Sequence, residues 1–436
     1  MGCMTPAPHG YRTVQIAEPR REEVLAVDRI AFAMTADPEV DELVPLTLDW
    51  DRTMAVEAAD GVHAGLLAGV HASYPFSLPV PGGATACSGL TWVGVRPDHR
   101  RRGILSSMIA THFDRSIARG EPVSALFAAE AGIYGRFGYG EAADNVRLTI
   151  PRGATLRDVP GTAALDLRLE AADADRHSDL IHTLHAAGGA GRPGWIERTT
   201  TLLRVRHLAD PRPWREGAEP LQIAVVRDGG AGGAAGTVRG YALFRRKSDW
   251  SSTGPTGTVR VAELVSIDPA ATHRLWSFLL DLDLMSTVET PMLAADDALL
   301  SLLVDPRGAA ARVSDNVWIR LLDVPAALAA RRYAAAADVV LEVTDALVPS
   351  NTGRWRVRTG PTVPDGAFGY PATVTATQDA PDLTLDVREL GAAYLGGRSL
   401  TALASAGLVV EHRTGALLRA SNAFGWPVAP LCSWIF

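Results

Sequence analysis

The feature that most constrains the fold is a segment in which an apolar strand passes through a basic turn into an amphipathic helix. Residues 93–105 read VGVRPDHRRRGIL, and the apolar spacing after Gly103 predicts a helix over residues 104–117. A further predicted strand, residues 123–127, follows that helix. The order strand, turn, helix, strand predicts an α/β unit.

The basic turn has the features of an anion-binding helix start. The first turn of a helix leaves backbone N–H groups without partners, and the helix dipole makes that end positive. A pyrophosphate fits there, and Gly103 lets its oxygens approach the backbone closely. Nearby arginines add charge-assisted hydrogen bonds and can hold a further phosphate. A solvated basic surface turn is the alternative, but the order of strand, turn, glycine and helix favours the phosphate interpretation.

The chain contains a second, weaker copy of this pattern. Residues 263–284, ELVSIDPAATHRLWSFLLDLDL, parallel residues 91–113, TWVGVRPDHRRRGILSSMIATHF. Both are a strand that ends at a proline turn and continues into an apolar helix. The second copy lacks Arg-Arg-Arg-Gly, so we expect it to keep the fold without the phosphate site.

The remaining third of the chain has a different predicted order of strands and helices. From residue 315, a strand leads into an alanine-rich helix, several alternating strands and two short helices, which is typical of an α+β domain. A chain of 436 residues is too long for one ordinary core. We predict three domains, over residues 1–158, 159–311 and 312–436.

Composition excludes several classes of protein. The formal net charge of −7 argues against a nucleic-acid-binding surface. No apolar run approaches 18 residues, so no membrane span is expected. Cys3, Cys87 and Cys432 are few and widely spaced, which predicts no metal site and fits a reduced, cytoplasmic compartment.

The basic loop resembles the acetyl-CoA motif of GNAT-fold acetyltransferases, Arg/Gln-x-x-Gly-x-Gly/Ala. Arg100 and Gly103 fit that motif, whereas Leu105 replaces the final small residue. Such a departure is expected in the Eis-type (enhanced intracellular survival) aminoglycoside/lysine N-acetyltransferases of actinobacteria, in which His-Arg-Arg-Arg-Gly precedes Leu or Ile. Three further stretches resemble that family: GIYGRFGYG at 132–140, DVRELGAAYLGGRSLTALASAG at 386–407 and FGWPVAPLCSWIF at 424–436.

The resemblance implies both a fold and an activity. The fold is α/β and α+β: tandem GNAT domains, the second without a cofactor loop, followed by a sterol-carrier-protein-like domain. The implied activity is direct transfer of the acetyl group of acetyl-CoA to a primary amine within a ternary complex. The acceptor would be an aminoglycoside, acetylated at one or more positions, or a lysine-like amine. Acetylation of aminoglycosides would confer antibiotic resistance. The family also implies a homo-oligomer, a hexamer. Its cofactor contacts correspond to Val93, Gly94, Val95, Arg100, Arg101, Arg102, Gly103, Ile104 and Leu105.

Amide formation at a thioester needs an acid for the departing sulfur and a base for the amine. Tyr134 and Tyr139 are the candidates for the acid, although spacing alone fits a packed tyrosine equally well. The family uses the first tyrosine of IYGRFGYG, which corresponds to Tyr134. Glu130 is one candidate base, directly or through water. The other is the carboxylate of Phe436, because the apolar tail is expected to be buried and in the family it enters the active site.

The acceptor pocket is less defined by sequence. Trp92 and Glu130 are candidate substrate-binding residues, and an acidic cluster of Asp37, Glu39, Asp41 and Glu42 could receive a cationic amine, although such clusters are usually solvated. A lipid-binding protein, based on the C-terminal domain, is one rival interpretation. An acetyltransferase for an unrelated cellular amine is the other.

Overall fold

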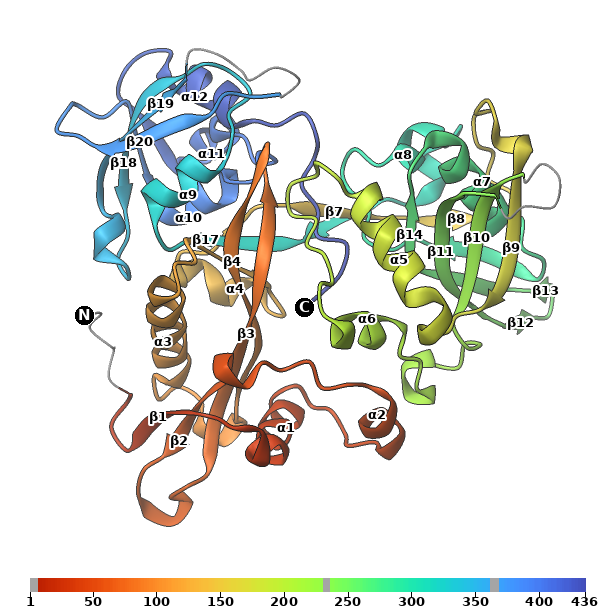
Figure 1. Cartoon of the computed structure of the whole chain (residues 1–436), viewed down its shortest axis with the longest axis horizontal. Coiled ribbons are helices and arrows are strands. Elements are labelled where there is room, and N and C mark those ends of the chain that lie inside the picture. The colour runs from red at the N-terminus through yellow and green to blue at the C-terminus, as the bar shows by residue number, and fades with distance from the viewer. Residues whose placement is uncertain (1–6, 230–235, 361–367) are drawn as a thin grey trace.

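The computed structural model describes residues 7–229, 236–360 and 368–436. Two mixed sheets and one smaller sheet form three units that surround the C-terminus, which lies in the middle of the molecule (Figure 1). The predicted strand, helix and strand of residues 91–127 are formed as expected. Residue Cys3 lies outside the described residues, and Cys87 and Cys432 are buried free thiols.

The first unit is built on a seven-stranded sheet with the order β1-β2-β3-β4-β5-β17-β6. Only the β4–β5 pair is parallel. The strands are β1 Tyr11–Gln15, β2 Met54–Ala58, β3 Leu67–Val80, β4 Gly83–Val95, β5 Val123–Phe127, β17 Val317–Leu321 and β6 Gly140–Glu141. Its helices are α1 Arg21–Ala31, α2 Pro38–Leu43, α3 Ile104–Ala118 and α4 Ala131–Tyr134.

A turn precedes the longest strand of this sheet. Gly61–His63 form a short 3-10 turn, and β3 begins at Leu67. Gly61 and Gly65 have φ of +71° and +86°, so they make the turn rather than part of a strand. The strand β3 then continues to Val80 because β4 pairs with it over almost its whole length.

The second unit repeats the architecture of the first. Its six-stranded sheet has the order β8-β15-β14-β11-β10-β9, with strands β8 Thr149–Pro151, β15 Met285–Glu289, β14 Gly257–Ser266, β11 Val238–Lys247, β10 Gln222–Asp228 and β9 Leu165–Ala171. Its helices are α5 Ala174–Gly188, α6 Thr201–Leu208, α7 Pro269–Leu280 and α8 Ala298–Leu302. The β14–α7–β15 segment corresponds to β4–α3–β5, and again only its two strands pair in parallel. The internal repeat predicted from the sequence is confirmed.

The third unit has the order β20-β19-β18-β21-β22. Its strands are β18 Asp338–Thr344, β19 Gly353–Thr359, β20 Ala372–Ala376, β21 Leu383–Asp386 and β22 Val409–Glu411, and its helices are α9 Val324–Ala330, α10 Val387–Ala393, α11 Leu400–Ser405 and α12 Ala416–Phe424. One buried apolar cluster joins this unit to the first sheet. The contact is close because Gly140 and Gly391 bring β6 and α10 backbone to backbone, where a Cβ on Gly140 would lie 2.0 Å from the Arg388 carbonyl oxygen.

Two short two-stranded sheets complete the description. β7 Asp144–Arg147 pairs with β16 Arg312–Asp315, and β12 Trp250–Ser251 pairs with β13 Gly254–Pro255. The β7–β16 pair lies at the junction between the first two units, because it is followed by β8 of the second sheet and by β17 of the first. In the described part of the chain, no helix has the length and apolar character needed to span a bilayer.

Candidate active site

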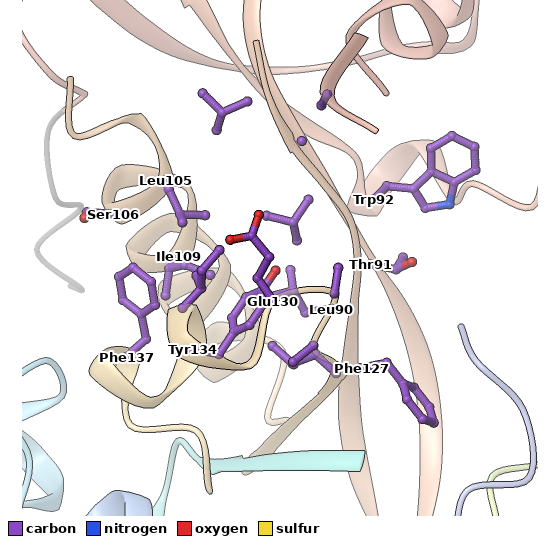
Figure 2. A pocket seen from close by; sticks show the side chains of 18 of the residues that line it. Leu90, Thr91, Trp92, Leu105, Ser106, Ile109, Phe127, Glu130, Tyr134 and Phe137 are labelled. Atoms are coloured by element: carbon purple, nitrogen blue, oxygen red, sulfur yellow. The ribbon is translucent and has the colours of Figure 1, made fainter. Parts of the chain in front are cut away.

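A cavity of about 2390 Å³ opens where the three units meet. Its walls come from α1, β4, the loop after β4, α3 and the segment after β5, and the end of the chain closes one side. Figure 2 shows Leu105 and Ile109 of α3 on one side and Leu90, Thr91 and Trp92 of β4 on the other, with Glu130 and Tyr134 between them.

The cavity exists because β4 and β5 separate. Their parallel pairing covers only three positions and ends at Gly89 and Ala125. Beyond that point, residues 90–95 present one backbone edge to the cavity, and β4 bulges because Trp92 and Val93 together oppose the single residue His71. Trp92 has a φ of +54°, an uncommon value for a non-glycine residue. An extended amide-containing ligand could bond to this open edge as an added strand would.

The basic loop forms an uncapped helix start beside this edge. Gly103 precedes α3 with a φ of +81°, and no side chain caps the helix there. The first bond within the helix runs from the Ser107 N–H to the Gly103 carbonyl at 3.0 Å, so the preceding N–H groups have no helical partner. Arg100 and Arg101 line the cavity, and within the described residues neither side chain makes a hydrogen bond or ion pair. These features fit the phosphates of a nucleotide cofactor.

Eight of the nine predicted cofactor residues line the cavity, and Arg102 does not. Its guanidinium instead donates to the Tyr11 hydroxyl at 2.9 Å and to the Asp98 carbonyl at 3.2 Å. Tyr11 also bonds to the buried ring of His99 at 2.8 Å. Arg102 therefore fastens the loop to β1, which leaves Arg100 and Arg101 to face a ligand.

In the described residues of the second unit, the start of α7 offers no such site, because side chains of the chain occupy the equivalent position. Asp268 caps α7 by accepting a hydrogen bond from the Ala271 N–H at 2.9 Å, and Arg239 pairs with the same carboxylate at 2.8 Å. A carboxylate at a helix start takes the place that a phosphate would use. The second unit therefore lacks the Arg-Arg-Arg-Gly of the first, and the Asp268 carboxylate already binds the start of its helix.

The C-terminal segment crosses from the third unit, between the first two, into the cavity. Asn316 holds it in both directions: its Oδ1 accepts from the Cys432 N–H at 2.8 Å and its Nδ2 donates to the Cys432 carbonyl at 3.0 Å. The Trp434 indole donates to the Ile196 carbonyl at 2.7 Å, and the Ser433 hydroxyl bonds to His185 at 2.8 Å. Partners on several elements therefore fix the last residues.

Phe436 ends the chain at the point where β4 and β5 part. Its ring lies 4.9 Å from the ring of Phe76 and 5.4 Å from that of Phe127. Gly89 leaves room for both neighbouring rings, since a Cβ there would lie 2.3 Å from Phe76 and 3.2 Å from Phe436. Phe436 lines the cavity, whereas the tail is not buried throughout, because Ile435 remains 64% exposed.

The two candidate tyrosines differ in their surroundings. Tyr139 is fully buried, and its hydroxyl bonds to Ser124 at 2.8 Å in a core that also contains His112. Tyr134 lines the cavity, and its hydroxyl makes no hydrogen bond to any described residue. Burial, and next the charge of Glu130, raise the pKa of Tyr134 to about 12. Of the two candidate tyrosines, Tyr134 is the one whose free, protonated hydroxyl faces a ligand in the cavity.

Two charged groups in the cavity wall had no clear signal in the sequence. Asp28 on α1 is 7% exposed, and burial raises its pKa to about 6 against the charges of Arg206 and Arg29. Arg206 on α6 reaches the same cavity from the second unit. The position of Asp28 four residues after Val24, on the apolar face of the helix, is the only sequence signal for a buried carboxylate.

A buried charged network in the second unit lies behind the tail. Glu263 accepts from Arg198 at 2.6 Å, from Tyr241 at 2.6 Å and from His207 at 3.0 Å. Burial acts to raise the pKa of Glu263, but the charges of Arg198 and His207 outweigh it and hold that pKa well below the ordinary value. Arg198 also stacks 5.3 Å from the ring of Trp434. The network thus fixes Arg198, which packs against Trp434 of the tail.

Most carboxylates of the acidic cluster after α1 have partners within the fold. Asp37 caps α2 by accepting from the N–H of Glu39 at 2.9 Å, and Asp41 pairs with Arg29 at 2.5 Å. The Glu39 carboxylate accepts from the Arg212 N–H at 3.1 Å. Among the residues described, no three His, Cys, Asp or Glu side chains are placed to hold a metal ion.

A separated β4–β5 pair beside an uncapped helix start defines a GNAT-fold acetyltransferase. Models of the acetyltransferase (GNAT) domain match residues 11–142 and 194–321, and a model of the sterol carrier protein domain matches residues 324–433. The chain is 32% identical to N-acetyltransferase Eis of Mycobacterium tuberculosis over 90% of this chain and 93% of that protein. It belongs to the Eis-type N-acetyltransferase family.

Other relatives agree with this assignment. An uncharacterised N-acetyltransferase of Streptomyces coelicolor is 43% identical over 87% of this chain and 88% of its own length. The crystal structure of Eis1 from Mycobacterium abscessus is 32% identical, superposes with a TM-score of 0.77, and covers 98% of this chain and 100% of that one. The chain is therefore an N-acetyltransferase with two GNAT domains and a sterol-carrier-like domain, as its sequence predicts.

Proposed function

We propose that the chain transfers the acetyl group of acetyl-CoA to a primary amine, of an aminoglycoside or of a lysine-like compound, within a ternary complex. The observation that carries the proposal is the continuous cavity that joins an uncapped helix start, an open strand edge, Tyr134 and the end of the chain. Acetyl-CoA supplies the activated thioester carbonyl. Every other step uses groups of this chain.

The cofactor residues act by position. The N–H groups at the start of α3 and the free guanidiniums of Arg100 and Arg101 hold the phosphates, while the backbone of Val93 and Val95 bonds to the pantetheine arm. The β4 edge thereby directs the thioester toward Tyr134 and Phe436. We place Gly94, Gly103, Ile104 and Leu105 in the same surface, and we assign Arg102 to holding the loop.

The transfer itself needs two proton movements. The carboxylate of Phe436 takes a proton from the acceptor ammonium, directly or through water, and leaves a neutral amine. The amine nitrogen bonds to the carbonyl carbon, the carbon–sulfur bond breaks, and Tyr134 gives its proton to the departing sulfur. The proton that the amine releases on forming the amide restores Tyr134. A raised pKa suits this step, because it keeps the hydroxyl protonated at neutral pH.

Glu130 and Trp92 border the acceptor side of the cavity. Glu130 is exposed just before α4, and Figure 2 shows its carboxylate directed into the cavity. We assign it to attracting the cationic acceptor. Trp92 packs partly against the cluster under α1 and supplies an apolar wall.

The proposal is tested by thiol release from acetyl-CoA across a panel of amines. The panel contains an aminoglycoside, lysine, a short diamine and an amine-free sugar as the control. We expect CoA release only with amines, together with a product that is heavier by one acetyl group for each amine modified. Acetyl-CoA that is not consumed with any amine would contradict the proposal.

Two features of organisation accompany this function. We propose unit boundaries near residues 158 and 311, with two exchanged strands: β8 of the first segment pairs in the second sheet, and β17 of the last segment lies between β5 and β6 of the first sheet. We also propose a hexamer, as the family resemblance implies. Light scattering on the purified chain tests it, and a monomer would contradict it.

A further inference from the structure

Two opposite charges in the cavity wall, Asp28 and Arg206, have no ion-pair partner among the described residues. Asp28 is almost buried, and its carboxylate makes no hydrogen bond or ion pair in the described part of the chain. Arg206 is half-buried, and its one hydrogen bond is a long one of 3.5 Å to the Pro45 carbonyl, with its guanidinium 5.7 Å from the Trp214 ring centroid. Arg29 is not a partner for Asp28, because it pairs with Asp41.

The two groups influence each other without forming an ion pair. Burial is the largest influence on both groups: it raises the pKa of Asp28 and lowers that of Arg206. Against it, the charge of Arg206 acts to lower the pKa of Asp28, and Tyr74 and then Asp28 act to raise the pKa of Arg206. Charged side chains in a half-buried position are normally paired, since desolvation without a partner is costly. Both side chains line the cavity, so a ligand there can supply both missing partners.

The pair discriminates between the acceptor classes. The charged groups of an aminoglycoside are all ammonium groups, which Asp28 would attract and Arg206 would repel. A compound with an ammonium beside a carboxylate would satisfy both residues, and the fork of Arg206 suits a carboxylate. Phe32 and Met34 line the cavity near Asp28 and expose apolar surface, which suits a methylene arm.

We propose that Asp28 and Arg206 form a subsite for the zwitterionic head of an amino-acid-like acceptor. Asp28 binds its α-ammonium, Arg206 binds its α-carboxylate, and a second amine on a flexible arm reaches the thioester. This subsite rests on the proposed acetyl transfer and specifies its acceptor. It also gives the second unit a function, since α6 of that unit supplies the residue that selects the substrate.

The test compares acceptors that differ only in charge. Lysine, lysine amide and 1,5-diaminopentane share the reacting amine, but only lysine carries the carboxylate. For the wild type we expect kcat/KM to be at least tenfold higher for lysine than for lysine amide. Arg206→Gln should remove this preference by raising KM for lysine while leaving lysine amide unchanged, and Arg206→Lys should keep part of it. Arg212→Gln, an exposed arginine outside the cavity, is the matched control.

Three results would overturn the subsite. Equal use of lysine and lysine amide by the wild type is the first. An equal loss with every acceptor in Arg206→Gln is the second, because it would mean that Arg206 only holds the units together. The third is turnover of an aminoglycoside without turnover of lysine, which would leave the acetyl transfer intact. Calorimetric titration of lysine in the presence of CoA gives a separate readout: binding at least tenfold weaker in Arg206→Gln supports the subsite, and unchanged binding overturns it. Absence of turnover with every amine would count against the acetyl transfer alone.

Discussion

Deletion of Phe436 is the most informative perturbation of the chemistry, because it moves the terminal carboxylate and leaves its anchors in place. An extended chain advances by about 3.3–3.6 Å per residue, so the carboxylate would retreat by about that distance. A hydrogen bond to nitrogen spans about 2.7–3.2 Å. The shortened tail would therefore be out of reach of the amine, while Cys432 and Trp434 would still bond to Asn316 and Ile196.

The expected magnitude follows from the contacts of that residue. A positioned general base contributes about 10²–10⁴-fold to the rate, so kcat should fall by about that factor. The ring of Phe436 is only partly buried, and its loss should cost less than the roughly 1.5–3 kcal/mol of a fully buried side chain. The protein should therefore remain folded, and acetyl-CoA affinity should change little because the phosphate loop is elsewhere in the cavity.

The assay is CoA release at saturating acetyl-CoA, with the melting temperature measured in parallel. Phe436→Leu is the matched control, since it keeps the carboxylate at the end of an equally long tail and should retain most of kcat. A folded deletion variant that turns over at the wild-type rate would show that the terminal carboxylate is not the base. Glu130 would then be the candidate to examine.

The remaining predictions concern the acid, the acceptor subsite and the support of the tail. Tyr134→Phe should lower kcat by about 10²-fold or more with little change in acetyl-CoA affinity, while Tyr139→Phe should reduce the melting temperature and spare kcat; equal effects of the two would refute the acid assignment. In the wild type, kcat/KM for a cationic amine should rise as the pH increases through about 6, because the pKa of Asp28 is raised to that value and only its ionised carboxylate attracts the amine. Asp28→Asn should abolish this rise in the pH profile, and an unchanged profile would refute the assignment. His185→Ala should lower kcat more than it raises KM for acetyl-CoA, because the His185 ring makes a hydrogen bond of 2.8 Å to the Ser433 hydroxyl in the tail. Ser433→Ala should produce a similar loss of kcat. A wild-type kcat in both variants would show that this contact does not position the tail.

Local sequence patterns predicted much of the fold. Residues 93–105 specify a strand end, a turn and a helix start within one short stretch, because apolar spacing, proline and glycine each act on their own neighbourhood. The helix α3 accordingly covers the residues expected of it and one more. The second copy of the unit was visible for the same reason. The sequence also shows that the second copy lacks Arg-Arg-Arg-Gly, but the capping of α7 by Asp268 was not predicted from it.

The long-range features were not available from such patterns. β17 lies between β5 and β6 although nearly 200 residues separate it from β5, and no local signal records that pairing. The path of the tail depends on Asn316, which lies more than 110 residues earlier in the chain, and on Ile196 of the second unit. The Asp28–Arg206 subsite combines helices from two GNAT units, so neither helix alone reveals it. Sequence spacing informs on one element at a time, whereas these features arise where elements meet.

Titration calorimetry with acetyl-CoA tests most directly the central claim that the chain has one working cofactor site, at the start of α3. The wild type should bind one acetyl-CoA per chain. Replacing both Arg100 and Arg101 by Gln should weaken binding at least tenfold, or about 1.4 kcal/mol, whereas Asp268→Asn at the start of α7 should leave it unchanged. Two bound molecules per chain, or full affinity after loss of both arginines, would contradict the account.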